Sequence, residues 1–392
     1  MKSLWNERVA SNFTTDLEQR VYTSNLLGLN DTLVLHGGGN TSVKSIVDGE
    51  EILFVKGSGW DLVSIKEEGF SPVKLLTLQE MATRSHLTDT EMVTEQKKAM
   101  LDENAPNPSV EAILHAIIPF KFVDHTHADA IVTISNSHQG RKHIKNLFPN
   151  FLVVPYIMPG FLLAQKIQEM TQWYDWEHCE GIILHNHGVF TFDNDAKKSY
   201  EKMIEVVSKA EQFLDDEAYL SSLEFLDIEP RNFDIDTLTN AISKAKEYEV
   251  IVKINQSSLA LNYASQHHLK VFATRGILTP EHIIRTKREP LILENDRVEE
   301  ALTEYMVNYK NYFDTFSSHQ MMLNPAPNYA IIHGVGVISF GKDEKEVTII
   351  NDIIEHTMLA IFHADKLGGY ESISIEESFK MEYWELEQNK LK

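Results

Sequence analysis

The chain has 392 residues, of which 43% are hydrophobic and 24% charged, so it is long enough for two or three globular domains. Its 58 acidic and 36 basic residues give a net charge of −22, which argues against nucleic acid or an anionic membrane as a partner. The single cysteine, Cys179, excludes an intrachain disulfide, and no apolar run approaches the roughly 18–20 residues of a membrane span, so we expect a cytoplasmic protein.

Strand and helix patterns alternate along the first 215 residues. Apolar residues at helical spacing predict helices over residues 16–27, 75–86, 89–102, 160–174 and 196–215. Ser109 is expected to cap a further helix that carries Glu111 and His115. Runs rich in β-branched and aromatic residues predict strands at residues 32–35, 51–55, within 122–136, at 151–157 and, as a strand–turn–strand unit, at 181–192. This alternation indicates an α/β fold in α/β/α layers.

The second half of the chain repeats part of the first. Residues 181–195 align without gaps with residues 329–343, and six of these fifteen positions are identical. Each block is followed by a long amphipathic pattern, which in the second copy covers residues 344–366. The sequence therefore predicts a duplicated strand–turn–strand–helix unit.

The repeat does not preserve the histidines of the first copy. His187 falls opposite Val335, and a looser match sets the pair His125 and His127 against residues 277–279. We therefore expect a catalytic domain over residues 1–228 and a degenerate lobe without metal ligands over residues 229–392, with the boundary in an acidic, Pro-containing segment.

Three histidines are candidates for a metal site. His125 and His127 are separated by one residue in an apolar run, so a β-strand would place both rings on one face. His187 comes from a His-Gly turn that follows another apolar run. A lone histidine in a strand is usually a hydrogen-bonded core residue, and we interpret His185 in this way. Three imidazoles with a nearby carboxylate are, however, typical of a catalytic zinc site with one open position.

Glu111 is the candidate carboxylate, and two interpretations stay open. A carboxylate at a helix start interacts favourably with the helix dipole, worth under about 1 kcal/mol. It could also serve as a general base beside the metal.

Two glycine-rich turns, residues 37–40 and 57–59, each follow a β-rich stretch. Backbone N–H groups in such turns can bind an anion, although ordinary tight turns have the same composition. Neither turn matches the phosphate-binding loop of nucleotide-hydrolysing enzymes.

These motifs, in this order, resemble the class II aldolase/adducin family. The resemblance rests on five motifs spread over residues 17–215: Gly38-Gly39-Asn40-Thr41-Ser42, Lys56-Gly57-Ser58-Gly59, Pro108-Ser109-Val110-Glu111, His125-Thr126-His127 and Asn186-His187-Gly188. The chain is most similar to the aldolase region of bifunctional rhamnulose-1-phosphate aldolase/alcohol dehydrogenase proteins, and this likeness continues through residues 279–287, 355–357, 367–370 and 382–384. The dehydrogenase domain of those proteins is expected to be absent.

The resemblance implies roles for particular residues. Zinc, or another divalent transition metal, would be bound by His125, His127 and His187, and the catalytic carboxylate would be Glu111. The implied phosphate contacts are Gly39, Asn40, Ser58, Gly59 and Ser109. Val110 stands where simple sugar-phosphate aldolases have a second serine, which removes one possible phosphate donor. The family also implies a homo-oligomer acting on a small sugar phosphate.

We therefore expect a zinc-dependent aldolase that cleaves a ketose 1-phosphate, with L-rhamnulose 1-phosphate first, to dihydroxyacetone phosphate and L-lactaldehyde. A pentulose-phosphate 4-epimerase or a dehydratase would use the same zinc and carboxylate. A non-catalytic, adducin-like interaction module is the alternative from another class. An aldolase with a Schiff-base lysine is a further option, for which the sequence offers no buried-lysine strand pattern.

Overall fold

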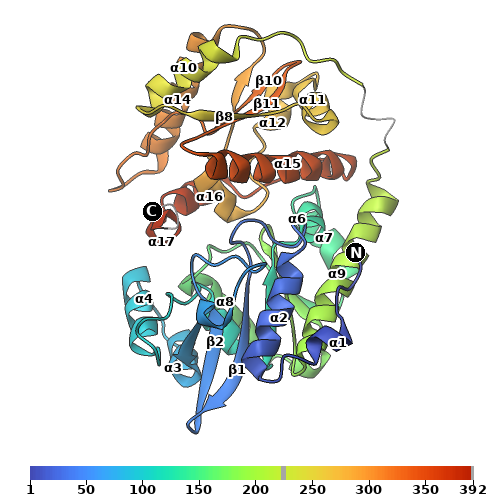
Figure 1. Ribbon diagram of the computed structural model, residues 1–392, viewed down its shortest axis with the longest axis vertical. Helices are drawn as coiled ribbons and strands as arrows, with labels where there is room; N and C mark the ends of the chain where they lie inside the picture. The colour runs from blue at the N-terminus through green and yellow to red at the C-terminus, as the bar shows by residue number, and fades with distance from the viewer. Residues whose placement is uncertain (222–226, 390–392) are drawn as a thin grey trace. The chain divides into compact units, whose positions relative to one another are not determined.

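The computed structural model describes residues 1–221 and 227–389, which form two compact units (Figure 1). Unit 1 comprises Met1–Ser135 and Gln139–Leu214, and unit 2 comprises Asn136–His138 and Asp215–Lys392. The expected domain boundary between residues 228 and 229 stays a prediction, because residues 222–226 just before it lie outside the described part of the chain.

Unit 1 is built on a seven-stranded sheet with the order β3-β2-β1-β4-β7-β6-β5. All neighbours are antiparallel except β5 and β6, which are parallel. The strands are β1 Asn40–Val47, β2 Glu50–Lys56, β3 Phe70–Lys74, β4 Phe122–Thr126, β5 Phe151–Val154, β6 Gly181–Leu184 and β7 Gly188–Asp193. The helices are α1 Glu7–Ala10, α2 Asp16–Gly28, α3 Leu75–Ala82, α4 Asp89–Lys98, α5 Ala112–Ile117, α6 Asp129–Ser135, α7 Gly140–Leu147, α8 Phe161–Thr171 and α9 Ala196–Glu217.

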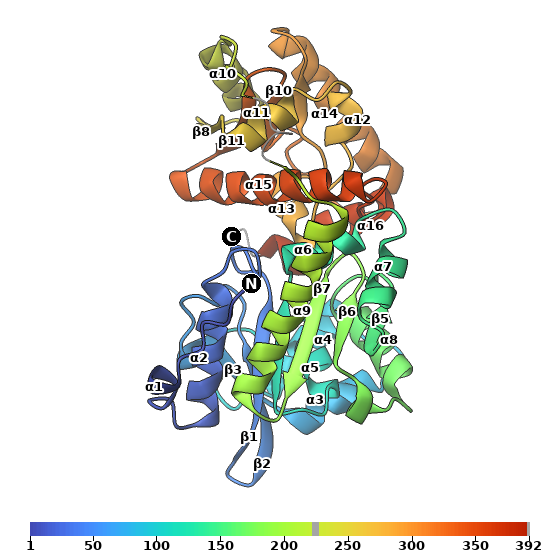
Figure 2. The same cartoon turned by 90° about the vertical axis from the view of Figure 1, so that its right-hand side faces the viewer.

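Strand β4 separates the two helical layers of unit 1. On one face, Asp124 accepts a hydrogen bond from Ser199 of α9, and Thr126 bonds Met203 of the same helix. On the other face, Val123 packs in a core cluster with side chains of α5 and α8. Since successive strand residues alternate between faces, His125 lies on the side of α5. The expected α/β/α layering is confirmed, and Figure 2 shows α9 running beside the sheet.

A buried ion pair fixes β4 against α2. The Arg20 guanidinium, which is fully buried, bonds the Asp124 carboxylate and also donates to the carbonyl oxygens of Ser42 and Val123, each at 3.3 Å. Charged groups this deeply buried persist only when they are paired and hydrogen-bonded. The pair therefore holds β1, β4 and α2 together behind the histidine-bearing face.

Unit 2 repeats half of this sheet. Its strand order is β8-β11-β10-β9, with the same directions as β4-β7-β6-β5 in unit 1. The strands are β8 Ile251–Asn255, β9 Leu291–Leu293, β10 Tyr329–Ile332 and β11 Gly336–Gly341. The helices are α10 Ile235–Lys246, α11 Ser258–Ala264, α12 Leu269–Ala273, α13 Ile283–Thr286, α14 Val298–Phe316, α15 Glu344–Lys366, α16 Ile375–Glu382 and α17 Glu385–Gln388. The duplicated strand–turn–strand–helix unit is confirmed.

The register of unit 2 corrects one detail of the expected repeat. His125 pairs with Phe190 between β4 and β7, and Ile254 pairs with Ile338 between β8 and β11. Because Phe190 and Ile338 are aligned in the repeat, Ile254 occupies the place of His125. The looser match to residues 277–279 is therefore wrong, and those residues lie outside the strands.

Other sequence expectations differ in extent. Residues 32–35 were expected as a strand, but residues 32–33 lie in a turn and residues 34–35 in no regular element. The Asn30 side chain accepts the backbone N–H of Thr32 at 3.0 Å, which favours the turn. The strand within 122–136 ends at Thr126, so His127 lies just beyond it. The segments expected as helices at 75–86 and 89–102 end earlier, at Ala82 and Lys98.

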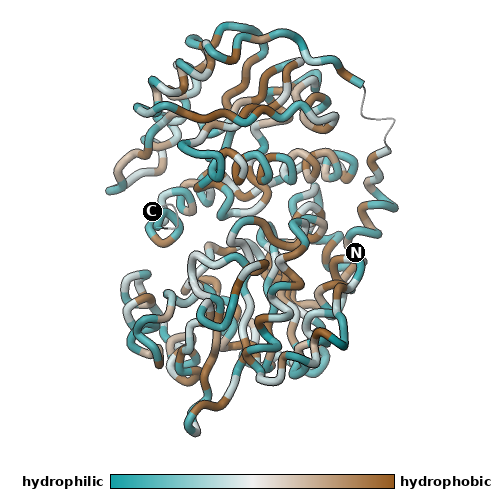
Figure 3. Tube along the Cα trace, in the orientation of Figure 1, coloured by the Kyte–Doolittle hydropathy of each residue, from teal (hydrophilic) through white to brown (hydrophobic). Residues whose placement is uncertain are grey.

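The hydropathy of the chain follows this architecture. In Figure 3 the apolar segments follow the strands, whereas the outer helices alternate between polar and apolar residues. Among the described residues, none of the helices combines the length and apolar character that crossing a membrane would require.

Candidate metal centre and active site

His125, His127 and His187 lie together in unit 1. Each can offer one ring nitrogen to a metal ion, and the three nitrogens lie within 4.8 Å of one another. The Nε2 atoms of His125 and His127 are 3.0 Å apart, close to the separation of about 3.3 Å between nitrogens bound to a tetrahedral zinc. His125 and His187 are buried and His127 is partly exposed. The structure thus brings together the three histidines that the sequence singled out.

The glycine of the His-Gly turn explains how His187 reaches the other two rings. A Cβ atom on Gly188 would lie 2.3 Å from the carbonyl oxygen of Thr126 and 2.9 Å from Cε1 of His125. Only glycine permits this approach of backbone to backbone. Asn186 adopts a left-handed conformation, with φ at 59°, which turns His187 back toward β4. His185 instead bonds the Ser135 hydroxyl at 2.9 Å, consistent with a structural role.

A backbone hydrogen bond orients the His125 ring. Its Nδ1 lies 3.1 Å from the carbonyl oxygen of Val189, and its ring stacks on Phe190 with centroids 4.0 Å apart. A carbonyl oxygen only accepts, so Nδ1 carries the hydrogen of the neutral ring and Nε2 keeps its lone pair. This is the tautomer that a metal-binding histidine needs.

Glu111 lies beside the three histidines, one residue before α5. Its Oε2 is 3.4 Å from Nε2 of His125, and its Oε1 is 3.9 Å from Nε2 of His187. The residue is only 4% exposed. The side-chain amide of Asn40 donates to Oε2 at 2.7 Å, whereas Oε1 is buried and accepts no hydrogen bond among the described residues. Both carboxylate oxygens thus lie beside ring nitrogens of the cluster, and Oε2 is also held by Asn40.

His115 is a buried member of the site to which the sequence analysis assigned no role. Its Nε2 bonds Oδ1 of Asn40, and its Nδ1 bonds the Ser42 hydroxyl at 2.8 Å. Since the amide of Asn40 donates to Glu111, its oxygen faces His115, whose Nε2 therefore carries the hydrogen. Burial holds the pKa of His115 well below its ordinary value, so the ring is neutral. His115 follows Glu111 by four residues, and this spacing was the signal in the sequence that could have placed His115 beside the carboxylate.

The two glycine-rich turns lie near each other in unit 1. The Lys56 ammonium, which is buried, donates to the carbonyl oxygen of Gly37 at 3.1 Å. Backbone bonds join the second turn to the segment before Glu111: Ser58 N–H to Asn107 O at 2.8 Å, and Ser109 N–H to Lys56 O at 3.1 Å. A Cβ atom on Gly38 would lie 3.4 Å from Nδ1 of His127, so the first turn also borders the histidines.

The five residues expected to contact phosphate occupy this region. Ser58 and Gly59 are exposed, Ser109 is partly exposed, and Gly39 and Asn40 are buried. Gly39 and Gly59 have φ values of 61° and 87°, which glycine adopts without strain. Both polar groups of the Asn40 side chain are engaged by Glu111 and His115. The phosphate-binding role of these residues stays a prediction.

Comparison with known proteins gives two family matches. Residues 18–214 match the family described as "Class II Aldolase and Adducin N-terminal domain". Residues 233–391 match the family described as "Aldolase class II, second domain". Together the matches cover most of both units.

The comparisons also find individual proteins that are similar to this chain. The chain is 29% identical over 417 residues to "Uncharacterized oxidoreductase YuxG" of Bacillus subtilis (strain 168). The match covers all of this chain and 60% of the length of that protein. The solved N-terminal class II aldolase domain of a conserved protein from Thermoplasma acidophilum is 39% identical, with a TM-score of 0.50, over 55% of this chain and 99% of that one. A sugar-phosphate aldolase from Thermotoga maritima is 16% identical, with a TM-score of 0.39, over 51% of this chain and 93% of its own.

Proposed function

The chain belongs to the class II aldolase and adducin family, and we propose that it is a divalent-metal-dependent aldolase that cleaves a ketose 1-phosphate into dihydroxyacetone phosphate and an aldehyde. The observation that carries this proposal is the position of the Glu111 carboxylate beside the three histidines, 3.4 Å from His125 and 3.9 Å from His187. A buried carboxylate with one engaged oxygen, next to three imidazoles, combines a metal-binding group with a proton carrier.

The residues present fit a divalent transition metal. The donors are three imidazole nitrogens, which suit zinc and also accept cobalt or manganese. The bond from His125 to Val189 sets the tautomer that leaves Nε2 available. We propose zinc, bound by His125, His127 and His187. When bound, such an ion supplies a Lewis acid that stabilises the negative charge developing on the substrate as its carbon–carbon bond breaks.

Glu111 is the proposed proton carrier. The Asn40 amide holds Oε2, so Oε1 is the atom that takes up or returns the proton at the reacting carbon. His115 and Ser42 orient Asn40 and thereby the carboxylate. A proton carrier fixed in this way avoids the cost of orienting during the reaction.

The glycine-rich turns are proposed to bind the substrate phosphate. Gly39, Ser58 and Gly59 would present backbone N–H groups, with the Ser58 and Ser109 hydroxyls as further donors. The ammonium of Lys56 lies at the base of the first turn and adds positive charge. Binding the remote phosphate would fix the reacting carbons relative to Glu111.

We propose L-rhamnulose 1-phosphate as the first substrate, with L-lactaldehyde as the aldehyde product, on the resemblance of residues 279–287 and 382–384 to the rhamnulose-phosphate aldolase region of bifunctional proteins. We further propose that the enzyme is a cytoplasmic homo-oligomer. The single cysteine and the acidic composition support this location.

The test is product analysis on zinc-loaded protein with L-rhamnulose 1-phosphate and with a pentulose 5-phosphate. We expect dihydroxyacetone phosphate to be released from the first sugar. If the product is a rearranged sugar and no triose phosphate is released, the enzyme is an epimerase and not an aldolase. If zinc binds but no product forms, the proposed metal site stands and the proposed substrate is wrong. Protein that binds no metal would support an adducin-like interaction module instead.

A further inference from the structure

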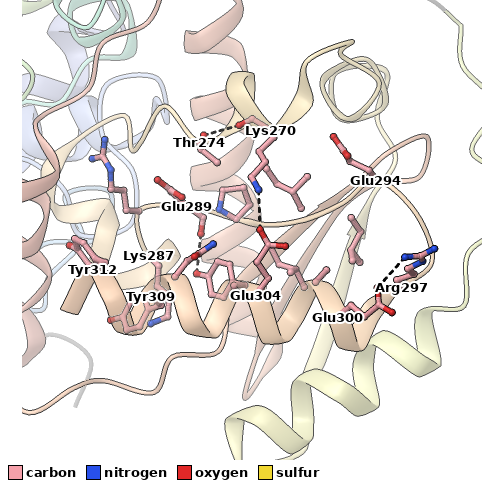
Figure 4. A pocket seen from close by; sticks show the side chains of 18 of the residues that line it. Lys270, Thr274, Lys287, Glu289, Glu294, Arg297, Glu300, Glu304, Tyr309 and Tyr312 are labelled. Atoms are coloured by element: carbon pink, nitrogen blue, oxygen red, sulfur yellow. Dashed lines mark hydrogen bonds and ion pairs between the residues drawn. The ribbon is translucent and has the colours of Figure 1, made fainter. Parts of the chain in front are cut away.

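Unit 2 contains a cavity of about 400 Å³ that has no part in the function proposed above. One wall is a face of α14 up to Tyr312 together with Arg297, the residue before the helix (Figure 4). Another wall is the segment from Lys287 to Asn295, which includes β9. Lys270 and Thr274 line a third side. A cavity of this volume accommodates a small metabolite.

Lys287 is held in an unusual backbone conformation at one end of this cavity. Its φ is 61° and its ψ 176°, a region of backbone space that is essentially restricted to glycine. Such a conformation costs about 1–3 kcal/mol and persists only where the surroundings enforce it. The residue is 6% exposed, and its ammonium donates to the carbonyl oxygen of Asn324 at 2.9 Å. Strain of this kind is concentrated at functional sites.

Two segments that are distant in the sequence meet at Lys287. Its Nζ lies 3.7 Å from the ring centroid of Tyr309 and 3.9 Å from Oε1 of Glu382. The Tyr309 hydroxyl donates to the same oxygen of Glu382 at 2.8 Å and also contacts the hydroxyl of Tyr383 at 2.9 Å. The sequence motifs at residues 279–287 and 382–384, which the first site does not use, therefore converge on one amine.

The surroundings favour proton transfer away from the Lys287 ammonium. Burial lowers the pKa of Lys287 to about 8, although the nearby charge of Glu382 acts in the opposite direction. Burial also raises the pKa of Glu382. The two shifts bring the proton affinities of amine and carboxylate closer together than in water. At pH 7 a pKa near 8 leaves about a tenth of the amine neutral, against less than about a thousandth at the ordinary lysine value. A desolvated lysine of this kind is a nucleophile toward carbonyl groups.

The charges of the other residues that line the cavity do not favour an anion. The basic side chains are Lys270, Arg288 and Arg297, and the acidic side chains are Glu289, Glu294, Glu300 and Glu304. Lys270 pairs with Glu304 at 3.2 Å, and Arg297 pairs with Glu300 at 3.4 Å. Carboxylates and tyrosine hydroxyls are instead suitable partners for the hydroxyl groups of a neutral ligand.

We propose that unit 2 carries a second site, in which Lys287 captures a small hydroxylated aldehyde or ketone as an imine. The Lys287 ammonium first passes a proton to the Glu382 carboxylate, and the neutral amine attacks the carbonyl carbon to form a C–N bond. One N–H proton moves to the former carbonyl oxygen, which gives a neutral carbinolamine. Protonated Glu382 then donates its proton to the hydroxyl group, which leaves as water, and the remaining N–H proton returns to the Glu382 carboxylate to leave the neutral imine. The step needs no oxidant or reductant, and water is its only by-product.

The experiment uses the full chain, glycolaldehyde as the probe, and cyanoborohydride at pH 7 to trap the imine as a stable secondary amine. Peptide mass spectrometry then gives the labelling rate of each lysine. We expect Lys287 to be labelled at least about tenfold faster than Lys270, an exposed lysine on the same cavity. The same result is expected with chelator-stripped protein, which separates this site from the metal centre of unit 1.

Two variants serve as a matched pair. Lys287→Arg keeps the positive charge and should remove the fast adduct, whereas Lys270→Arg should leave it in place. If Lys287→Arg does not fold, the labelling rates of Lys287 and Lys270 in the unsubstituted chain still test the proposal. Labelling of Lys287 that is no faster than that of Lys270 would overturn the proposal and leave Lys287 as a buried ion-pair partner of Glu382.

Discussion

The side-chain amide of Asn40 donates a hydrogen bond to Oε2 of Glu111 across 2.7 Å, and this contact joins the first residue of β1 to the residue before α5. The amide oxygen of Asn40 is fixed in turn by His115, which is itself bonded to Ser42. A buried chain of neutral hydrogen-bonding groups therefore helps to orient Glu111.

Replacement of Asn40 by aspartate keeps the shape of the side chain and removes the donor to Glu111. A second carboxylate would then face Glu111, so repulsion should displace the proton carrier. We expect the rate of triose-phosphate release to fall about 10- to 100-fold while the protein remains folded. Asn104→Asp, in an exposed loop, is the control and should keep the full rate. An Asn40→Asp variant with the full rate would show that Glu111 needs no such support.

His115 should make the stability of the protein depend on pH. Its pKa in the folded protein is well below the ordinary value of 6.5, chiefly because of burial, so below pH 6.5 the unfolded chain binds a proton that the folded chain excludes. The stability that this neutral histidine contributes is present above pH 6.5 and is lost as pH falls toward the folded-state pKa. The expected slope is up to about 1.4 kcal/mol per pH unit.

His115→Gln removes this titration and retains a polar group that can bond Asn40. Urea unfolding of chelator-stripped protein between pH 5 and pH 7.5 should show a flatter profile for the variant than for the unsubstituted chain. The other histidines titrate in both proteins and cancel in the difference. Parallel profiles would contradict a neutral, buried His115.

Gly188→Ala should weaken metal binding. The new methyl group would meet the Thr126 carbonyl oxygen at 2.3 Å and the rings of His125 and His127 at 2.9 and 3.1 Å, so the turn must move away from β4. We expect zinc affinity to fall at least about tenfold, as measured by competition with a chromophoric chelator.

The repeat supplies the control for this substitution. Gly336, the aligned residue of unit 2, would bring a Cβ within 2.4 Å of the Asn255 carbonyl oxygen. Gly336→Ala should therefore destabilise the protein by a similar steric mechanism while leaving zinc affinity unchanged. Equal losses of affinity in both variants would assign the effect to general destabilisation.

The histidine cluster could be predicted because its signals are local. Two histidines separated by one residue point to the same side of an extended chain, and here this held although β4 ends at Thr126, before His127. A His-Gly turn can approach a neighbouring strand closely. The prediction of a duplicated unit had a similar basis, in fifteen consecutive aligned residues. By contrast, β8 shares only one residue with β4 in the corresponding register, so the strand that replaces β4 was not recognisable from the sequence.

The support of Glu111 could not be predicted, because it depends on long-range pairing. Asn40 lies 71 residues from Glu111, and it reaches the site only because β1 pairs with β4 in a register that sets Asn40 opposite His125. The meeting of Lys287 and Glu382 in unit 2 has the same character. Residue types alone gave no reason to connect these segments.

We propose that His125, His127 and His187 bind the metal while Glu111 transfers the proton. We would measure zinc content together with dihydroxyacetone phosphate release from L-rhamnulose 1-phosphate for the unsubstituted chain, His187→Ala and Glu111→Gln. We expect release that requires zinc, loss of both zinc and release in His187→Ala, and retained zinc with at least about a 100-fold lower rate in Glu111→Gln. Full release from zinc-free protein, or an undiminished rate in Glu111→Gln, would contradict these roles.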